Sequence, residues 1–274
     1  MNKEQIIKKA SEKTELSKDD LSLIRSVTDV TSLNDTDTET SIRNFCEKIT
    51  SFSHEQYGLK PVPAVCVYPQ FIGTAKKALI NTGVKVAAVA GSFPTGQTFF
   101  KVRLNEIEEA VNAGADEIDT VINRGAAIER DLNRIADEIK RSKEICGNIK
   151  LKVILETGQF NDLTLLQEVC DAALESGADF LKTSTGKVSE GATLEKGYVL
   201  AERIKVFYEK TGEKRGIKYS GGIRTGEQAM QYCRLTREVL GSYRITPELF
   251  RIGAGSLMNN LHNEIAEIKN HPWE

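Results

Sequence analysis

Glycine recurs along this chain at a nearly constant interval, and most occurrences separate a helix-like stretch from an apolar, β-branched run. The interval is roughly thirty residues, which is about the length of one βα unit. Glycine is the residue most often found just past a helix C-terminus, where the backbone turns left-handed. The repeat therefore predicts alternating helices and strands, with the glycines Gly83, Gly114, Gly147, Gly177, Gly212 and Gly241 as boundaries.

Eight runs fit this pattern, and we expect each of them to be a strand followed by a helix. They span 26–31, 64–68, 84–91, 115–122, 149–157, 179–184, 216–221 and 249–253. Strands that alternate with helices form a parallel sheet, and eight such units close most naturally into a (β/α)8 barrel, with an open doubly wound sheet as the alternative. We predict an α/β fold consisting of a single TIM-barrel domain over 1–274, in which a helical extension (1–25) precedes the barrel (26–269) and the last helix covers 255–269.

Length and composition suit this fold and exclude several classes of protein. The chain has 274 residues, of which 40% are hydrophobic and 28% charged, and its net charge is −2. No basic tract indicates nucleic acid binding, and neither the start of the chain nor any apolar run indicates a signal or a membrane span. Five scattered cysteines without a CxxC pair indicate free thiols in a reducing compartment. We expect a cytoplasmic protein with no nucleic acid or membrane partner.

Charged residues interrupt four consecutive expected strands. Asp119, Lys152, Lys182 and Lys218 stand in otherwise strand-like segments, and Lys152 shares a face with Glu156. The simplest interpretation of one such lysine is a paired or snorkelling charge. Repetition on neighbouring strands favours a functional site, because an unpaired buried charge is too costly to be tolerated without purpose.

Three amines beside one or two carboxylates would repel one another. Repulsion and burial together lower the pKa of a lysine and leave a neutral amine, which forms imines with carbonyl compounds. The pattern therefore indicates Schiff-base chemistry, although spacing does not choose between Lys182 and Lys218. Cys66 and Lys152 are further candidates for the lining of the pocket.

Glycine-rich segments follow the last two expected strands, and the pair Gly186-Lys187 follows the sixth. Barrels frequently bind phosphate at the loops after strands seven and eight, through backbone N–H groups and a helix N-terminus. The alternative is that these glycines only form turns. The candidate phosphate-binding residues are Gly186, Lys187, Gly221, Gly222, Gly253, Gly255 and Ser256.

Other motifs do not support a different chemistry. The pair Gly186-Lys187 lacks the upstream glycine of a P-loop, and the segment 253–255 lacks the rest of a dinucleotide fingerprint. None of the three histidines, His54, His262 and His271, falls at an expected strand end, so we expect neither a metal nor another cofactor. The acidic segment 33–40 is better explained by a helix-capping box of Thr36 and Glu39 than by a metal site.

Six motifs together resemble the deoxyribose-phosphate aldolase family, in order and over residues 26 to 260. They read TDVTSLN (28–34), CVYP (66–69), LKVILETG (151–158), LKTSTGK (181–187), KYSGGIRT (218–225) and IGAGSL (252–257). The resemblance implies a class I, metal-independent aldolase with a TIM-barrel fold. Its implied reaction is the reversible cleavage of 2-deoxy-D-ribose 5-phosphate to D-glyceraldehyde 3-phosphate and acetaldehyde, in deoxyribose phosphate catabolism.

The resemblance also implies roles for particular residues. Lys182 matches the Schiff-base lysine, Lys218 matches a proton donor and acceptor that lowers the pKa of its neighbour, and Asp119 matches a participant in proton transfer. The chain departs from the family at Tyr219 and Ser220, because the family motif often reads KPxGG or KAxGG where this chain reads KYSGG. We expect this difference to adjust the pocket without loss of function. The C-terminal NHPWE of the chain also lacks the tyrosine of some members.

Several alternatives stay open at this point. One is a class I aldolase or transaldolase-like enzyme for another phosphorylated sugar, and another is a metal-dependent isomerase. A third is a catalytically silent phosphosugar-binding barrel, which would require the loss of a lysine or aspartate that this chain retains. The expected partners are a phosphorylated sugar and acetaldehyde, with a homodimer as one possible assembly.

Overall fold

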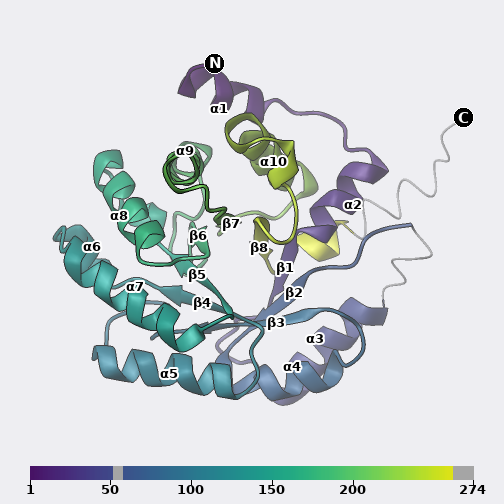
Figure 1. Ribbon diagram of the computed structural model, residues 1–274. Helices are drawn as coiled ribbons and strands as arrows, with labels where there is room; N and C mark the ends of the chain where they lie inside the picture. The colour runs from purple at the N-terminus through teal and green to yellow at the C-terminus, as the bar shows by residue number, and fades with distance from the viewer. Residues whose placement is uncertain (52–57, 262–274) are drawn as a thin grey trace, which may run out of the picture.

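The computed structural model describes residues 1–51 and 58–261, and its strands form a closed parallel barrel in the order β1 to β8 (Figure 1). The barrel closes where β1 pairs with β8. The predicted TIM barrel is therefore confirmed, and the open doubly wound sheet is excluded. The strands are β1 (Thr28–Thr31), β2 (Ala64–Val67), β3 (Lys85–Ala90), β4 (Glu117–Val121), β5 (Lys150–Ile154), β6 (Phe180–Lys182), β7 (Gly216–Ser220) and β8 (Phe250–Ala254).

Helices surround the barrel, one or two between each pair of strands (Figure 1). They are α3 (Glu39–Ser51), α4 (Ile72–Ala78), α5 (Phe100–Asn112), α6 (Arg124–Ile128), α7 (Leu132–Cys146), α8 (Leu163–Glu175), α9 (Leu194–Thr211) and α10 (Gly226–Leu240). Short 3-10 helices are η1 (Pro69–Phe71), η2 (Thr157–Gln159) and η3 (Ser242–Arg244). Within the described ranges, no helix is both long and apolar enough to cross a bilayer.

The repeated glycines all have the backbone conformation that the sequence pattern predicts. The φ angles of the six range from 53° at Gly147 to 100° at Gly177, in the left-handed region that glycine tolerates best. Gly147, Gly212 and Gly241 are themselves helix C-caps. The periodicity therefore reflects a backbone requirement of the turns that lead from a helix into the next strand.

Two helices precede the barrel, as predicted. They are α1 (Lys3–Ser11) and α2 (Lys18–Ser26), and Figure 1 shows α1 beside α10. Ion pairs connect α1 to the outer helices, from Lys3 to Glu195 over 2.9 Å and from Lys9 to Glu238 over 2.7 Å. At the other end, the last helix begins at position 257 rather than 255. Its predicted end and the predicted barrel boundary at 269 lie outside the described residues, as do the three histidines.

The predicted capping box of Thr36 and Glu39 is wrong by two residues. The N–H of Ser41 donates to Oγ1 of Thr38 over 3.1 Å, and the N–H of Thr38 donates to Oγ of Ser41 over 2.8 Å. Asp37 instead accepts from the side chain of Ser32 and the N–H of Asn34. A serine therefore takes the position usually held by glutamate, which a glutamate-based motif search does not detect.

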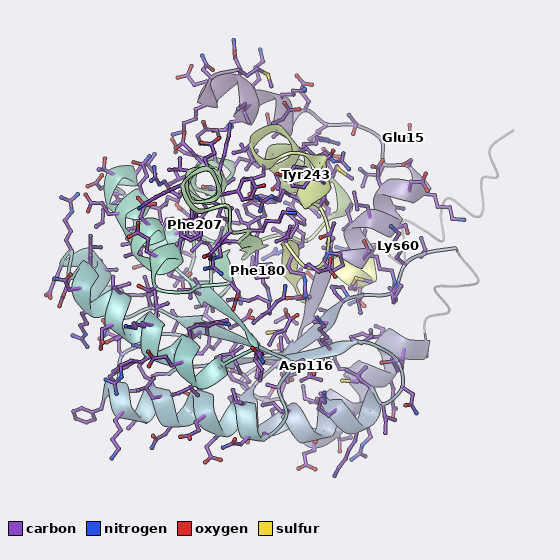
Figure 2. The ribbon with its side chains drawn as sticks, viewed as in Figure 1. Glu15, Lys60, Asp116, Phe180, Phe207 and Tyr243 are labelled. Carbon is purple, nitrogen blue, oxygen red and sulfur yellow. The ribbon has the colours of Figure 1, made fainter. Side chains whose placement is uncertain are left out.

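The apolar core consists of two separate clusters. The larger lies between strands and helices and contains the outward-facing residues of the strands, such as Leu181 and Ile217. The smaller, formed by Leu33, Cys66, Ala87 and Val89, comes largely from the inward faces of β2 and β3. The rest of the barrel interior is mostly polar, apart from residues such as Phe180 near its centre (Figure 2).

Two helical glycines provide a matched test of this packing. A Cβ added at Gly73 in α4 meets no atom within 4 Å, whereas one at Gly197 in α9 would lie 2.8 Å from the ring of Tyr219. Gly73→Ala should raise the free energy of unfolding by up to about 1 kcal/mol, through helix propensity. Gly197→Ala should lower it by about 1–3 kcal/mol, because the tyrosine must move. Urea unfolding measures both changes, and equal shifts for the two variants would contradict the packing described for Tyr219.

Candidate active site

One carboxylate inside the barrel, that of Asp119 on β4, accepts hydrogen bonds from three lysine amines. Its Oδ1 lies 2.7 Å from Nζ of Lys152. Its Oδ2 lies 2.7 Å from Nζ of Lys182 and 2.8 Å from Nζ of Lys218. Lys182 keeps 4% of its surface exposed, and the other three residues keep none. The structure thus brings together the four charged residues that interrupt the expected strands.

The register of the barrel explains why these side chains meet. Asp119 stands opposite Lys152 on β5, and Lys182 stands opposite Lys218 on β7. Side chains alternate along a strand, so all four point to the same side of the sheet, which in this barrel is the inside. Because an eight-stranded barrel is only wide enough for packed side chains, residues from strands β4 to β7 reach one another near its axis.

Three further charged residues complete this group, which we call the lumen cluster: Asp29, Glu117 and Arg251. Nζ of Lys218 lies 2.5 Å from Oδ2 of Asp29, and Nζ of Lys152 lies 2.6 Å from Oε2 of Glu117. Arg251 connects the two carboxylates by donating to Asp29 and, over 2.8 Å, to Oε1 of Glu117. Sequence reasoning missed these three, although each is a charged residue in an expected strand and thus meets the criterion that singled out Asp119.

The charges of the lumen cluster do not balance when every group is ionised. Four cations (Lys152, Lys182, Lys218, Arg251) contact three carboxylates (Asp29, Glu117, Asp119). Such an excess is costly in a buried environment, since a charge transferred from water needs a partner. Loss of one proton from a lysine would restore the balance.

Lys182 is the group that is easiest to deprotonate. Burial lowers its pKa below the ordinary value, and although Asp119 opposes this, the ammonium of Lys218 lowers it further. Burial acts in the same direction on Lys152 and Lys218, but two carboxylates beside each outweigh it and raise both pKa values. Burial also disfavours the charge of Asp119, yet the surrounding amines hold its pKa well below the usual range.

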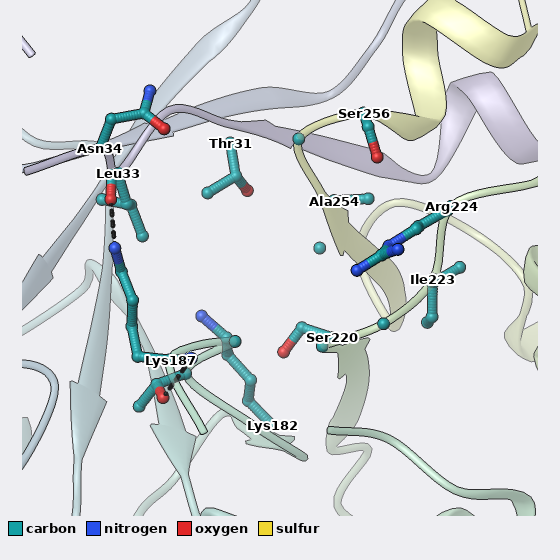
Figure 3. Close-up of a pocket in the computed structure, with 16 residues that line it drawn as sticks. Thr31, Leu33, Asn34, Lys182, Lys187, Ser220, Ile223, Arg224, Ala254 and Ser256 are labelled. Atoms are coloured by element: carbon teal, nitrogen blue, oxygen red, sulfur yellow. Dashed lines mark hydrogen bonds between the residues drawn. The ribbon is translucent and has the colours of Figure 1, made fainter. Parts of the chain in front are cut away.

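Lys182 also differs from the other lysines of the lumen cluster in facing a cavity. The cavity has a volume of about 240 Å³ and opens at the C-terminal ends of the strands. Figure 3 shows the Lys182 amine pointing into it. The other lining residues are Thr31, Leu33, Asn34, Thr185, Gly186, Lys187, Ser220, Gly221, Gly222, Ile223, Arg224, Gly253, Ala254, Gly255 and Ser256. All seven predicted phosphate-binding residues are therefore in the lining.

Backbone N–H groups provide one anion-binding feature of this cavity. Within the described part of the chain, no protein acceptor is found for the N–H groups of Gly222, Ile223, Gly255 or Ser256. Gly222 has a φ of 84°, which glycine adopts at no steric cost. Successive unpaired N–H groups in such turns form concavities that favour negatively charged oxygens.

Arg224 is a functional candidate that sequence reasoning overlooked. Its guanidinium points toward the cavity in Figure 3, and across the described ranges no acidic side chain pairs with it. Its position in SGGIRTG, next to two predicted phosphate-binding glycines, was the available signal. An arginine can bind a phosphate through two parallel hydrogen bonds, so Arg224 strengthens the anion-binding character of this end of the cavity.

The Gly186-Lys187 corner has a different arrangement from the other loops. The N–H of Gly186 donates to Oγ of Ser184 over 3.0 Å, and the N–H of Lys187 donates to Oγ1 of Thr185 over 3.1 Å. The amine of Lys187 donates to the carbonyl of Leu33 over 2.6 Å. This corner thus offers the cavity the charge of a fixed ammonium, while its N–H groups are already paired.

Two residues expected in the pocket lie behind its lining instead. Cys66 is fully buried in the small inner apolar cluster, and burial raises the pKa of its thiol. Lys152 is fully buried between Asp119 and Glu117. Neither is among the residues that line the cavity described above.

The two departures from the family pattern have different positions. Tyr219 points outward, and its ring stacks on that of Tyr232 at a centroid distance of 4.6 Å. Its hydroxyl lies 3.2 Å from the hydroxyl of Thr236. It therefore makes no direct contribution to the pocket, contrary to our expectation. Ser220 does line the cavity (Figure 3). Its hydroxyl donates to the carbonyl of Ser184 over 2.5 Å.

Comparison with known proteins agrees with this geometry. The DeoC/LacD family aldolase model matches residues 25–234. Deoxyribose-phosphate aldolases of Mus musculus and Homo sapiens are each 39% identical over 256 residues, with 89% of this chain and 80% of each relative covered. This chain belongs to the DeoC/LacD aldolase family. It is an aldolase, a carbon–carbon lyase, and the resemblance noted in the sequence is confirmed.

Solved structures of aldolases share the fold. The tetrameric deoxyribose phosphate aldolase of Aeropyrum pernix is 26% identical, with a TM-score of 0.70, and the match covers 96% of this chain and 98% of that one. A structure described as the aldolase QR15 is 28% identical, with a TM-score of 0.72, and the match covers 91% and 99% of the two chains. This chain thus shares its fold with both solved aldolases.

The charge imbalance makes a prediction about stability. Lys182→Met should change the free energy of unfolding by no more than about 1 kcal/mol, because three cations and three carboxylates remain in contact. Lys152→Met should lower it by about 3–5 kcal/mol, because Glu117 and Asp119 lose a shared partner in a buried environment. Urea unfolding at pH 7 compares the two, and a greater loss in the Lys182 variant would contradict its place as the surplus charge.

Proposed function

We propose that this aldolase reversibly cleaves 2-deoxy-D-ribose 5-phosphate to D-glyceraldehyde 3-phosphate and acetaldehyde, through a Schiff base on Lys182, in deoxyribose phosphate catabolism. One observation carries the proposal. A lysine of lowered pKa faces a cavity whose far end combines unpaired N–H groups with two cationic side chains. A carbonyl compound with a phosphate at the other end of a short chain fits both features. The relatives named deoxyribose-phosphate aldolase support this choice of substrate.

The two ends of the cavity assign the orientation of the substrate. The phosphate would accept hydrogen bonds from N–H groups of Gly222, Ile223, Gly255 and Ser256 and from Arg224, with Lys187 adding a positive charge. The aldehyde at C1 of the open-chain sugar would then reach the amine of Lys182. Phosphate binding far from the reacting carbon holds that carbon in place, which lowers the entropic part of the barrier.

Imine formation begins with the neutral amine of Lys182. Its lone pair attacks C1 to form a C–N bond, and the carbonyl oxygen takes a proton to give a carbinolamine. Loss of water then gives a protonated imine, whose positive charge makes it an electron sink. Asp119 and Lys218 are the proposed carriers of these protons. Oδ2 of Asp119 accepts from Nζ of Lys218 over 2.8 Å and also accepts from the amine of Lys182.

Cleavage takes place between C2 and C3, because acetaldehyde contains C1 and C2. A base removes the proton of the C3 hydroxyl, the C2–C3 bond breaks, and its electron pair moves into the imine to form an enamine. The fragment that contains C3, C4 and C5 leaves as D-glyceraldehyde 3-phosphate. Protonation of the enamine at C2 and addition of water to the resulting imine release acetaldehyde and the free Lys182 amine. All atoms of the sugar phosphate are then accounted for without a redox step.

Borohydride trapping tests the covalent step directly. Reduction in the presence of acetaldehyde should attach one ethyl group to Lys182, which peptide mass spectrometry would locate. Lys182→Met should bind no label and should lose turnover, whereas Lys218→Met should keep a residue that can be labelled. A label on Lys218 in the native enzyme, or no label at all, would overturn the assignment.

The lowered pKa of Lys182 gives a pH dependence of known sign. Only the neutral amine attacks an aldehyde, so the rate of trapping should rise with pH and reach half its maximum below 10.5, the ordinary pKa of a lysine. Lys218→Met should move this midpoint to a higher pH, because it removes a neighbouring positive charge and leaves Asp119 more available to the ammonium of Lys182. A midpoint that is unchanged or lower would contradict the role of Lys218.

A reducing, cytoplasmic location and a homodimer remain predictions from the sequence. All five cysteines are free and buried, which supports a reducing compartment. Light scattering of the purified chain would test the homodimer.

A further inference from the structure

Glu156, on the loop that follows β5, is a buried carboxylate outside the lumen cluster. Its side chain has no exposed surface. Its backbone is left-handed, with φ 57° and ψ 58°, a conformation that is uncommon for residues other than glycine, asparagine and aspartate. A strained backbone that places a charge out of water must be fixed by its surroundings, and such residues often occur at functional sites.

The Glu156 carboxylate binds the loop after β6 through three hydrogen bonds. Oε1 accepts from Oγ of Ser184 over 2.6 Å and from the N–H of Thr185 over 3.2 Å. Oε2 accepts from Oγ1 of Thr185 over 2.6 Å. These two residues immediately precede the Gly186-Lys187 corner of the cavity. A carboxylate on one loop thus holds the base of the loop that contributes to the substrate pocket.

The chemistry of a carboxylate fixes the direction of the whole network. An ionised carboxylate only accepts, so both hydroxyls must donate their single protons to Glu156. Their lone pairs are then directed at the N–H groups of Gly186 and Lys187, which donate to them over 3.0 and 3.1 Å. Each hydrogen bond in this two-branched chain therefore depends on the charge of Glu156.

Arg124 extends the network to a third loop. Its guanidinium lies 3.8 Å from Oε2 of Glu156 and donates to the carbonyl of Pro94 over 2.9 Å. At the other end of the network, the amine of Lys187 donates to the carbonyl of Leu33, which follows β1. Segments that follow five strands, β1, β3, β4, β5 and β6, are therefore joined around the mouth of the barrel, with Glu156 at the centre of the connections.

We propose that Glu156 is a positioning residue that holds the Gly186-Lys187 corner in place for the phosphate end of the substrate. Among the described residues, no hydrogen bond or ion pair joins its carboxylate to Lys182 or to the lumen cluster, so we expect its effect on phosphate recognition. The inference rests on the proposed function, because the corner matters in this way only if the cavity binds a phosphorylated substrate.

The experiment compares a phosphorylated substrate with the same sugar lacking phosphate. In Glu156→Gln, an NH2 group replaces one of the two accepting oxygens, so one hydroxyl loses its acceptor. The Gly186-Lys187 corner should then lose its fixed position. The ratio of kcat/KM for 2-deoxy-D-ribose 5-phosphate to that for 2-deoxy-D-ribose should fall about tenfold or more, mainly through KM. The rate of borohydride trapping with acetaldehyde, which needs no phosphate, should stay within about twofold of the native rate.

Glu190→Gln is the matched control. It makes the same chemical change on the loop that carries the corner, but there the half-exposed side chain of Glu190 pairs with Lys196 and not with the corner. This variant should leave the substrate ratio unchanged. Ser184→Ala and Thr185→Val provide an independent test in case Glu156→Gln folds poorly. Each should lower the ratio. When either is combined with Glu156→Gln, the double variant should lose less than the sum of the two single losses, because the residues act in one network.

The outcomes separate this inference from the proposed function. A native enzyme that acetaldehyde and borohydride do not label would overturn the proposed function. If the native enzyme is labelled but Glu156→Gln keeps the native substrate ratio, the positioning role is wrong. Equal losses with both sugars and in trapping would also overturn it, since they would indicate a general structural effect.

Discussion

The contact between the Asp119 carboxylate and three lysine amines is the interaction on which the site depends. In a barrel this narrow, water cannot screen the charges, so every charged group needs a partner inside the protein. Asp29 and Glu117 supply partners for Lys218 and Lys152, and Arg251 joins these two carboxylates. One cation remains in excess. The lysine whose pKa is lowered is Lys182, which is the only lysine of the cluster that borders the cavity.

The interior of the barrel is divided into regions with different chemistry. The strands from β4 round to β1 carry the charged residues, whereas β2 and β3 contribute the small apolar cluster of Cys66, Ala87 and Val89. Above both lie the loops with unpaired N–H groups and Arg224. The amine of Lys182 lies where these regions meet, so it is close both to the charged residues of the lumen cluster and to the loops with unpaired N–H groups.

Much of this arrangement could be predicted from local patterns. The glycine period identified the units, and strand alternation placed Asp119, Lys152, Lys182 and Lys218 on one face. The same alternation also places Glu117 on the face of Asp119, and Arg251 is likewise a charged residue in an expected strand. Neither residue was identified from the sequence. The direction of Tyr219 was also readable, since it neighbours inward-facing Lys218. Other features could not be read locally: Glu156 contacts residues 28 and 29 positions away, and the Thr38–Ser41 capping pair is a variant of the usual motif.

The sequence by itself determined the fold, the reactive residue types and the family, because these depend on periodicity, side-chain chemistry and short motifs. Tertiary structure decided which lysine has a lowered pKa, since a pKa depends on burial and on charges from distant parts of the chain. Lys218 and Asp29 are 189 residues apart, and Arg251 and Glu117 are 134 apart. Only closure of the barrel brings these charges together, and only then does Lys182 become the surplus cation.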